Sequence, residues 1–252
     1  MKRLYIILVC ITFTIFGIYF IRGSNNIKLQ IENENFKFYS LNKDRECLDD
    51  LSNVIEENYN KISNDLNIKL DEKVVIEIYP DISSFHNAIG VSNEANWIVG
   101  IGWDNQIKML SPLNPGEEHT YNTLVQVLVH EFTHILINKI NSELDSIPIW
   151  LNEGVATYEA NQMNDNGISF IKESLENNSV PSLSEMTSEG FVEVGGYIFS
   201  YTIIEYIVEN YGYDAVRSLI RNPANLENIL GNNISDFEDT WNDYLKERVW
   251  KY

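Results

Sequence analysis

The central part of the chain, residues 121–140, reads YNTLVQVLVHEFTHILINKI and is apolar on nearly every side of a helix. This pattern predicts a buried helix rather than an amphipathic one on the surface. Three ionisable residues lie within the apolar part of this run, namely His130, Glu131 and His134. Burying such groups costs free energy unless they are paired or bind a ligand, so this helix is the candidate functional element.

The segments on either side of this helix predict an α+β fold. Before it, residues alternate with the period of strands or follow a helical period. The predicted elements there are a hairpin at 27–39, a helix within 42–66, a strand at 73–79 that Pro80 ends, a short helix through Phe85 and Ala88, and a second hairpin at 97–112 that turns at Asp104 and Asn105. After it, the pattern is helical at 150–158, at 197–211 and within 225–252. Thr120 is the predicted N-cap of the central helix.

His130 and His134 are four residues apart, so a helix stacks their imidazoles on one face and places Glu131 on the adjoining face. Two imidazoles at this spacing can both bind a zinc ion at roughly 2.0 to 2.1 Å. The neighbouring carboxylate can then take a proton from a water molecule that the metal activates. The HExxH pattern fixes only three positions, so the alternative is a helix with two ordinary buried histidines.

A candidate for a third metal ligand lies in the next apolar segment. After Pro148, residues 150–158 read WLNEGVATY, and eighteen residues separate His134 from Glu153. Two histidines and one glutamate leave the fourth position of a tetrahedral zinc ion open for water, as catalytic zinc sites do. Glu153 taken alone would be an exposed acid in the first turn of a helix. Together with the two histidines, it is the predicted third ligand.

The chain resembles the gluzincin metallopeptidases, the group that includes thermolysin and the zinc aminopeptidases. The resemblance lies in the motif HEFTH and in the segment WLNEGVATY, whose glutamate follows HEFTH after eighteen residues. The spacing is that of the aminopeptidases. The threonine of HEFTH and the short chain look more like the compact bacterial thermolysin-like and collagenase-like domains of the peptidase MA superfamily. The resemblance covers about residues 70 to 250 and is most specific at 130–158. It implies a thermolysin-like (zincin) domain with one Zn²⁺ ion.

By this resemblance, the strand before the active helix lies along the cleft and pairs with an extended peptide through main-chain bonds. That strand would consist of Val99, Gly100, Ile101, Gly102 and Trp103. The alternative is a hairpin packed on the core, in which the glycines relieve crowding. Tyr197 matches, by its surroundings, the aminopeptidase tyrosine that stabilises the developing oxyanion. Tyr201 is the alternative donor to the oxyanion. For both tyrosines, the other alternative is that they only pack on the core.

The sequence also departs from the family. It contains no G-x-M-E-N segment, which holds the amino terminus of the substrate in the aminopeptidases, so exopeptidase activity is not supported. At Thr157 the thermolysin group has an aspartate that supports a ligand histidine, and a threonine is a weaker partner for an imidazole.

The amino-terminal end predicts a membrane anchor. Lys2 and Arg3 precede eighteen uncharged, mostly apolar residues, and Arg22 follows them. That length is near the minimum for crossing a bilayer. No small-x-small cleavage site follows it, so we expect an anchor that is not cleaved, and secretion after signal cleavage is the alternative. The positive charges favour a cytoplasmic amino terminus. We expect a cytoplasmic end at 1–3, a transmembrane signal-anchor at 4–21, and an extracellular metallopeptidase domain at 27–252, with an α/β lobe at 27–115 and a mainly helical lobe at 116–252.

Charge and cysteine content narrow the possible partners. The formal net charge is -19, and Lys2, Arg3 and Arg22 supply +3 in a segment without acids, so the rest of the chain carries -22. Nucleic acid is not expected as a partner, because its binding needs clustered basic side chains. Cys10 and Cys47 cannot form a disulfide within the outer domain, which is typical of a bacterial cell surface. We expect Cys47 to be a core thiol and His86 to be a surface or capping residue.

These patterns predict a membrane-anchored zinc endopeptidase for extracellular peptides or proteins. Zinc would be held by His130, His134 and Glu153, with Glu131 as general base and Tyr197 at the oxyanion. The alternative is a surface binding or sensing module that keeps the metallopeptidase fold without turnover.

Overall fold

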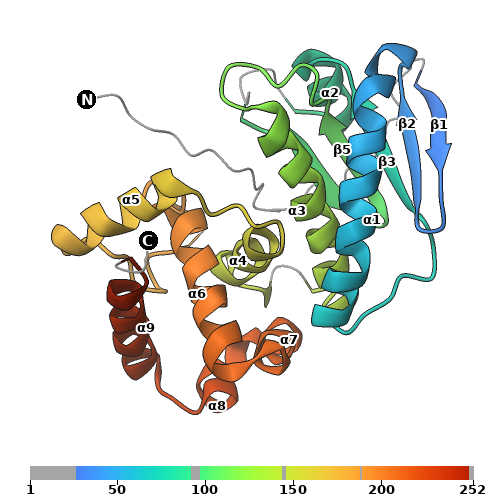
Figure 1. The fold of residues 1–252 in the computed structure, drawn as a ribbon. Helices are drawn as coiled ribbons and strands as arrows, with labels where there is room; N and C mark the ends of the chain where they lie inside the picture. The colour runs from blue at the N-terminus through green and yellow to red at the C-terminus, as the bar shows by residue number, and fades with distance from the viewer. Residues whose placement is uncertain (1–26, 92–96, 144–145, 188, 250–252) are drawn as a thin grey trace. The chain divides into compact units, whose positions relative to one another are not determined.

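The computed structural model describes residues 27–91, 97–143, 146–187 and 189–249 (Figure 1). The contacts in space between their Cα atoms group these residues into two compact units, 27–139 and 140–249. The division into lobes at residues 115 and 116 remains a prediction from the sequence.

The first unit contains a five-stranded mixed sheet with strand order β1-β2-β3-β5-β4. The strands are β1 (Lys28–Glu32), β2 (Phe36–Ser40), β3 (Val74–Tyr79), β4 (Gly100–Trp103) and β5 (Gln106–Leu110). β2, β3 and β5 are parallel to one another, while β1 and β4 pair antiparallel at the two ends of this order. The predicted mixed sheet and both predicted hairpins are therefore confirmed.

The hairpin between β4 and β5 turns at two residues with short polar side chains, as the sequence predicted. Asp104 and Asn105 both have positive φ, at 44° and 59°. Two successive residues of this kind form a turn whose twist matches that of the flanking strands, and aspartate and asparagine tolerate the left-handed region better than other residues with a side chain. The register of β4 against β5 follows from this two-residue turn.

Three helices complete the first unit: α1 (Leu48–Asp65), preceded by the 3-10 turn η1 (Asn42–Cys47), α2 (Ile82–Ile89), and α3 (Tyr121–Ile140). α1 and α3 lie side by side over one face of the sheet (Figure 1). Phe132 of α3 packs against Phe36 of β2 and Tyr59 of α1, with ring centroids 5.6 Å apart in both pairs. This aromatic cluster fixes α3, the helix that carries the candidate site, to the sheet and to α1.

The second unit is helical, as predicted. It consists of α4 (Ile149–Glu159), α5 (Asp165–Glu176), α6 (Gly196–Tyr211), α7 (Tyr213–Arg221), the turn η3 (Pro223–Asn225), α8 (Leu226–Leu230) and α9 (Ile234–Val249). α6 lies at the centre of the core: its Phe199 ring contacts Trp241 of α9 at 6.0 Å, and the Trp241 indole donates a hydrogen bond to the Thr202 hydroxyl at 3.2 Å. The mixed sheet and the helical remainder together make an α+β fold.

Within the described ranges, no helix has both the length and the apolar character that a membrane crossing requires. The predicted signal-anchor at 4–21 lies outside those ranges, so it stays a prediction from the sequence.

Candidate metal centre

α3 begins where the sequence predicted and is capped by two threonines. The backbone N–H of Thr123 donates to the Thr120 hydroxyl at 3.2 Å, and the backbone N–H of Thr120 donates to the Thr123 hydroxyl at 2.8 Å. This reciprocal arrangement satisfies two donors at the helix start, as a capping box does. The predicted N-cap role of Thr120 is confirmed.

The two histidines of α3 form a buried pair of imidazoles. His130 is 1% exposed and His134 is 7% exposed, their Nε2 atoms lie 3.0 Å apart, and their rings meet edge to face with centroids 4.6 Å apart. Two nitrogen ligands of one tetrahedral zinc ion lie about 3.3 Å apart, because each is roughly 2.0 to 2.1 Å from the metal. The pair therefore already has nearly the spacing that a shared zinc ion requires.

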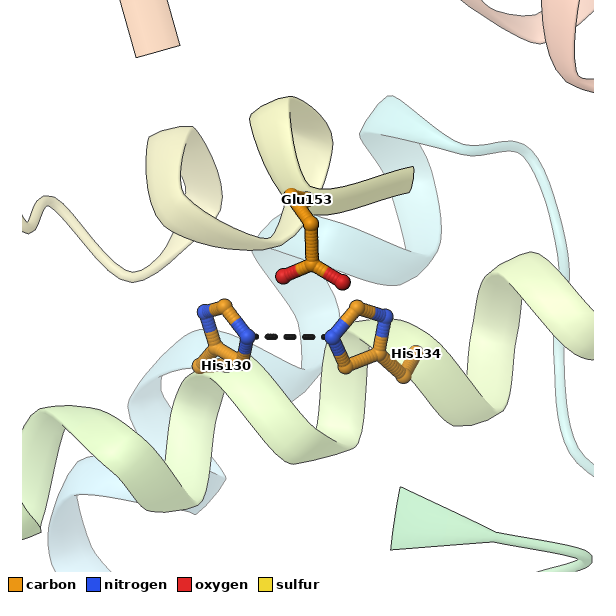
Figure 2. A group of neighbouring side chains, drawn as sticks. All are labelled: His130, His134 and Glu153. Carbon is orange, nitrogen blue, oxygen red and sulfur yellow. Dashed lines mark hydrogen bonds between the residues drawn. The ribbon is translucent and has the colours of Figure 1, made fainter. Parts of the chain in front are cut away.

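Glu153 joins the two histidines in a group that could hold a metal ion. One ligand atom from each of the three side chains lies within 4.8 Å of the other two, and all three residues are buried. Figure 2 shows the Glu153 carboxylate directed toward the imidazole pair. Two imidazole nitrogens and one carboxylate oxygen form the donor set of catalytic zinc sites, which keep one coordination position for water. Among the described residues, no other group of three such side chains was found.

α4 is held close to α6 directly beside Glu153. A Cβ atom on Gly154 would lie 2.7 Å from the backbone oxygen of Ser200 and 2.8 Å from a side-chain carbon of Ile204, closer than real Cβ contacts. The absence of a side chain at Gly154 thus permits the close approach of the two helices. The position of Glu153 is therefore set by backbone packing between α4 and α6.

Thr157 follows Glu153 by one helical turn, and its hydroxyl bonds to its own helix. The hydroxyl donates to the backbone oxygens of Glu153 and Gly154, at 2.8 and 3.0 Å. A threonine hydroxyl has one proton to donate, and here the backbone takes it. This agrees with the expectation that Thr157 supports an imidazole less well than the aspartate of the thermolysin group would.

Glu131 lies against the backbone of β4. Glu131 is 4% exposed. A Cβ atom on Gly100 would lie 3.0 Å from both Cγ and Oε1 of Glu131, and one on Gly102 would lie 2.2 Å from its backbone oxygen. The crowding that the sequence suggested for these glycines is therefore present, and Glu131 is the residue that causes much of it. Sequence reasoning had not identified this contact.

Tyr197 and Tyr201 both pack on other aromatic rings of the helical unit. The ring of Tyr197 meets that of Phe191 edge to face, with centroids 4.9 Å apart, and the ring centroids of Tyr201 and Tyr158 are 5.4 Å apart. The guanidinium carbon of Arg248 lies 5.9 Å from the centre of the Tyr201 ring. These contacts supply the packing role that the sequence left open, and the oxyanion role stays a prediction for either tyrosine.

One histidine was misjudged from the sequence. His86 was expected at the surface or as a cap, but it is fully buried and its Nε2 lies 3.0 Å from the backbone oxygen of Ile98. That carbonyl lies twelve residues further along the chain, so no local pattern around His86 could have revealed the pairing. Cys47, in contrast, is a buried free thiol, as predicted.

A buried imidazole pair with an adjacent glutamate, on a helix packed against a mixed sheet, is typical of metal-dependent hydrolases of the HExxH type. Comparison with known families agrees with this class. The family described as the peptidase MA superfamily matches residues 55–247. The chain belongs to this superfamily. No curated protein matched the sequence significantly. The family indicates a zinc metallopeptidase, a hydrolase whose substrates are peptides or proteins.

Proposed function

We propose that the protein is a membrane-anchored zinc endopeptidase that hydrolyses extracellular peptides or proteins. The observation that carries this proposal is the buried His130 and His134 pair, with nitrogens at nearly the spacing of zinc ligands and a glutamate between them in sequence. Two buried histidines and a buried glutamate on one helix have little reason to occur together unless they serve a metal and its chemistry.

His130, His134 and Glu153 are the residues that would hold the metal. Their two nitrogens and one oxygen suit zinc better than magnesium or calcium, which prefer oxygen ligands. When bound there, a zinc ion would supply a Lewis acid that polarises the peptide carbonyl and makes a water molecule more acidic.

Glu131 is the proposed general base. It would accept a proton from the attacking water and deliver it to the amine that leaves when the peptide bond breaks. Its nearly complete burial keeps bulk water away from the carboxylate, which strengthens its interaction with a charged or polar reacting group. Tyr197 is the proposed donor to the oxyanion, and Tyr201 is the alternative.

The hydrogen bonding of β4 supports its proposed role as the substrate strand. The backbone N–H of Leu110 donates to the oxygen of Val99, and in an antiparallel pair such bonded positions alternate. Ile101 and Trp103 therefore also bond to β5, whereas Gly100 and Gly102 direct their N–H and C=O groups to the opposite side. In the described sheet, β4 pairs with β5 alone, so an extended peptide that reaches these buried glycines could add to the sheet at this edge.

The membrane part of the proposal rests on the sequence of residues 1–26. The apolar segment at 4–21 would anchor the chain as a single crossing, with residues 1–3 in the cytoplasm and the domain at 27–252 outside the cell. Protease digestion of intact cells would test this orientation, because only an outward-facing domain would be degraded.

The test of the enzymatic proposal uses the full chain, purified in mild detergent, loaded with zinc and incubated with a diverse peptide mixture. New peptide termini are mapped by mass spectrometry, and Glu131→Gln is the matched blank because it keeps the shape of the side chain but not its basicity. We expect internal cuts with the parent and a loss of most turnover in Glu131→Gln at equal zinc content. Absence of cuts from a fully zinc-loaded parent would favour a binding module without turnover, and a fully active Glu131→Gln would remove Glu131 from the mechanism.

A further inference from the structure

Gly100 of β4 lies against the side of α3 that carries Val127 and the Glu131 side chain. A Cβ atom there would be 2.6 Å from Cγ1 of Val127 and 3.0 Å from Cγ and Oε1 of Glu131. Gly102 differs from it, because its Cβ would meet the backbone of Glu131, with the carbonyl oxygen at 2.2 Å and the carbonyl carbon at 2.9 Å. Gly102 therefore permits the packing of strand on helix, whereas Gly100 faces the carboxylate-bearing side chain itself.

The same glycine also belongs to the side of β4 that is not bonded to β5. The alternation of hydrogen-bonded positions directs the main-chain N–H and C=O of Gly100 away from β5. One residue thus combines two properties. Its main-chain N–H and C=O point away from β5 in a buried part of β4, and its missing side chain leaves room for Glu131.

We propose that Gly100 is a positioning residue, which sets the place of the Glu131 carboxylate beside the main-chain groups that bind an extended peptide. This inference rests on the proposed function, in which Glu131 is the general base. It extends that function in one respect. Because residue 100 has no Cβ atom, the carboxylate of Glu131 can lie close to the strand that binds the substrate.

The outcome of adding that atom follows from the stiffness of its two neighbours. Val127 is β-branched and in a helix has essentially one χ1 rotamer, so it cannot turn away easily. Glu131 has a longer side chain with more rotatable bonds, and it would move instead. A misplacement of about 1 Å in a catalytic group can cost a factor of 100 in rate, so Gly100→Ala should lower kcat by about 10- to 100-fold. The N–H and C=O of residue 100 remain, and KM should therefore change by less than about threefold.

Val127→Ala distinguishes positioning from packing. This substitution removes Cγ1, the atom that the new Cβ would approach most closely, but leaves the contact with Glu131. The full chain is prepared as the parent, Gly100→Ala, Val127→Ala and the double variant. Zinc content, melting temperature, kcat and KM are measured for each, with a peptide substrate identified from the mapped cuts. If Gly100→Ala alone does not fold, the double variant carries the comparison against Val127→Ala, because its main clash has been removed.

If Gly100 positions Glu131, the double variant should regain the melting temperature of Val127→Ala while its kcat stays at least tenfold lower. Equal kcat in the double variant and Val127→Ala would show that residue 100 affects packing only, and the inference would be wrong. A parent that cleaves no peptide would instead refute the proposed function. An active parent together with an unimpaired Gly100→Ala would leave the proposed function in place and refute this inference alone.

Discussion

Arg248 and Glu205 form a buried ion pair that joins α9 to α6, and Arg248→Met should destabilise the helical unit strongly. The guanidinium bonds to both carboxylate oxygens, through Nε to one and through Nη2 to the other at 3.1 Å. The side chains are only 6% and 13% exposed. Methionine keeps much of the length and apolar volume of arginine, so the substitution removes mainly the charge and its hydrogen bonds.

The expected magnitude comes from the carboxylate that remains. Removing one partner of a buried ion pair costs about 3 to 5 kcal/mol, because the other charge is left buried without compensation. The hydroxyl of Tyr244 also bonds to Glu205, and burial followed by the charges of Glu205 and Glu209 raises the pKa of that tyrosine, so it stays a proton donor. We therefore expect a loss near the lower end, about 3 kcal/mol in the free energy of unfolding. For a chain of this size, that corresponds to about 6 to 12 °C in melting temperature.

Urea unfolding followed by circular dichroism measures this loss, and α9 offers a matched control. Lys246 pairs with Asp243 at 2.8 Å, but these side chains are 60% and 74% exposed. Exposed pairs contribute about 0 to 1 kcal/mol, so Lys246→Met should change stability by less than about 1 kcal/mol. A second variant, Arg248→Met with Glu205→Leu, removes both charges and should recover most of the loss. If Arg248→Met were as stable as Lys246→Met, the buried pair would contribute no more to stability than an exposed pair does.

Three further outcomes are expected. His134→Ala should abolish stoichiometric zinc binding, measured by atomic absorption after dialysis against a weak chelator, and retained zinc at one ion per chain would exclude His134 as a ligand. Burial raises the pKa of the Cys47 thiol from 9.0 to about 11, so at pH 8 its alkylation, followed by mass spectrometry, should be about 100-fold slower in the native protein than in urea, and equal rates would contradict the burial. Burial raises the pKa of Asp44 above its ordinary value of 3.8. The folded state therefore binds the proton more tightly, and this contribution to stability is present at low pH and lost as the pH rises through the raised pKa. Asp44→Asn should accordingly gain stability relative to the parent between pH 4 and neutrality in urea titrations, and a difference that is constant with pH would argue against a buried acid.

The helix of the candidate site was predictable to its ends because several local signals agree. The apolar run from Tyr121 to Ile140 is long, Thr120 precedes it, and the structure begins and ends the helix at the same residues. The two histidines needed only helical geometry to be placed together. Glu153 lies in another helix, and local sequence pattern does not specify how the chain returns from one helix to the other. The nearness of Glu153 to the histidines was predicted from the donor set and a family resemblance.

Burial of polar residues on the second face of the sheet was not predictable in the same way. Lys108 alternates with apolar neighbours in β5, which favours an exposed position, yet it is 3% exposed. Its Nζ donates to the backbone oxygen of Ala88 in α2 at 3.2 Å and lies 3.6 Å from the Glu77 carboxylate. Such burial depends on which helix covers the sheet face, and strand alternation contains no information about that cover. The burial of His86 in α2 also depends on tertiary structure, through its contact with the backbone oxygen of Ile98.

The proposed substrate edge of β4 has a consequence for the behaviour of the protein in solution. If the main-chain groups of Gly100 and Gly102 bind a peptide as proposed, they could equally bind the same edge of a second molecule, and such edges are starting points for aggregation. Proline or a lysine side chain on the edge would block this association, but it would also obstruct a bound peptide. The formal charge of -19 offers another protection, because molecules of like charge repel one another before their edges can meet. That protection weakens as salt screens the charges, so high ionic strength is the condition in which self-association through β4 would first become visible.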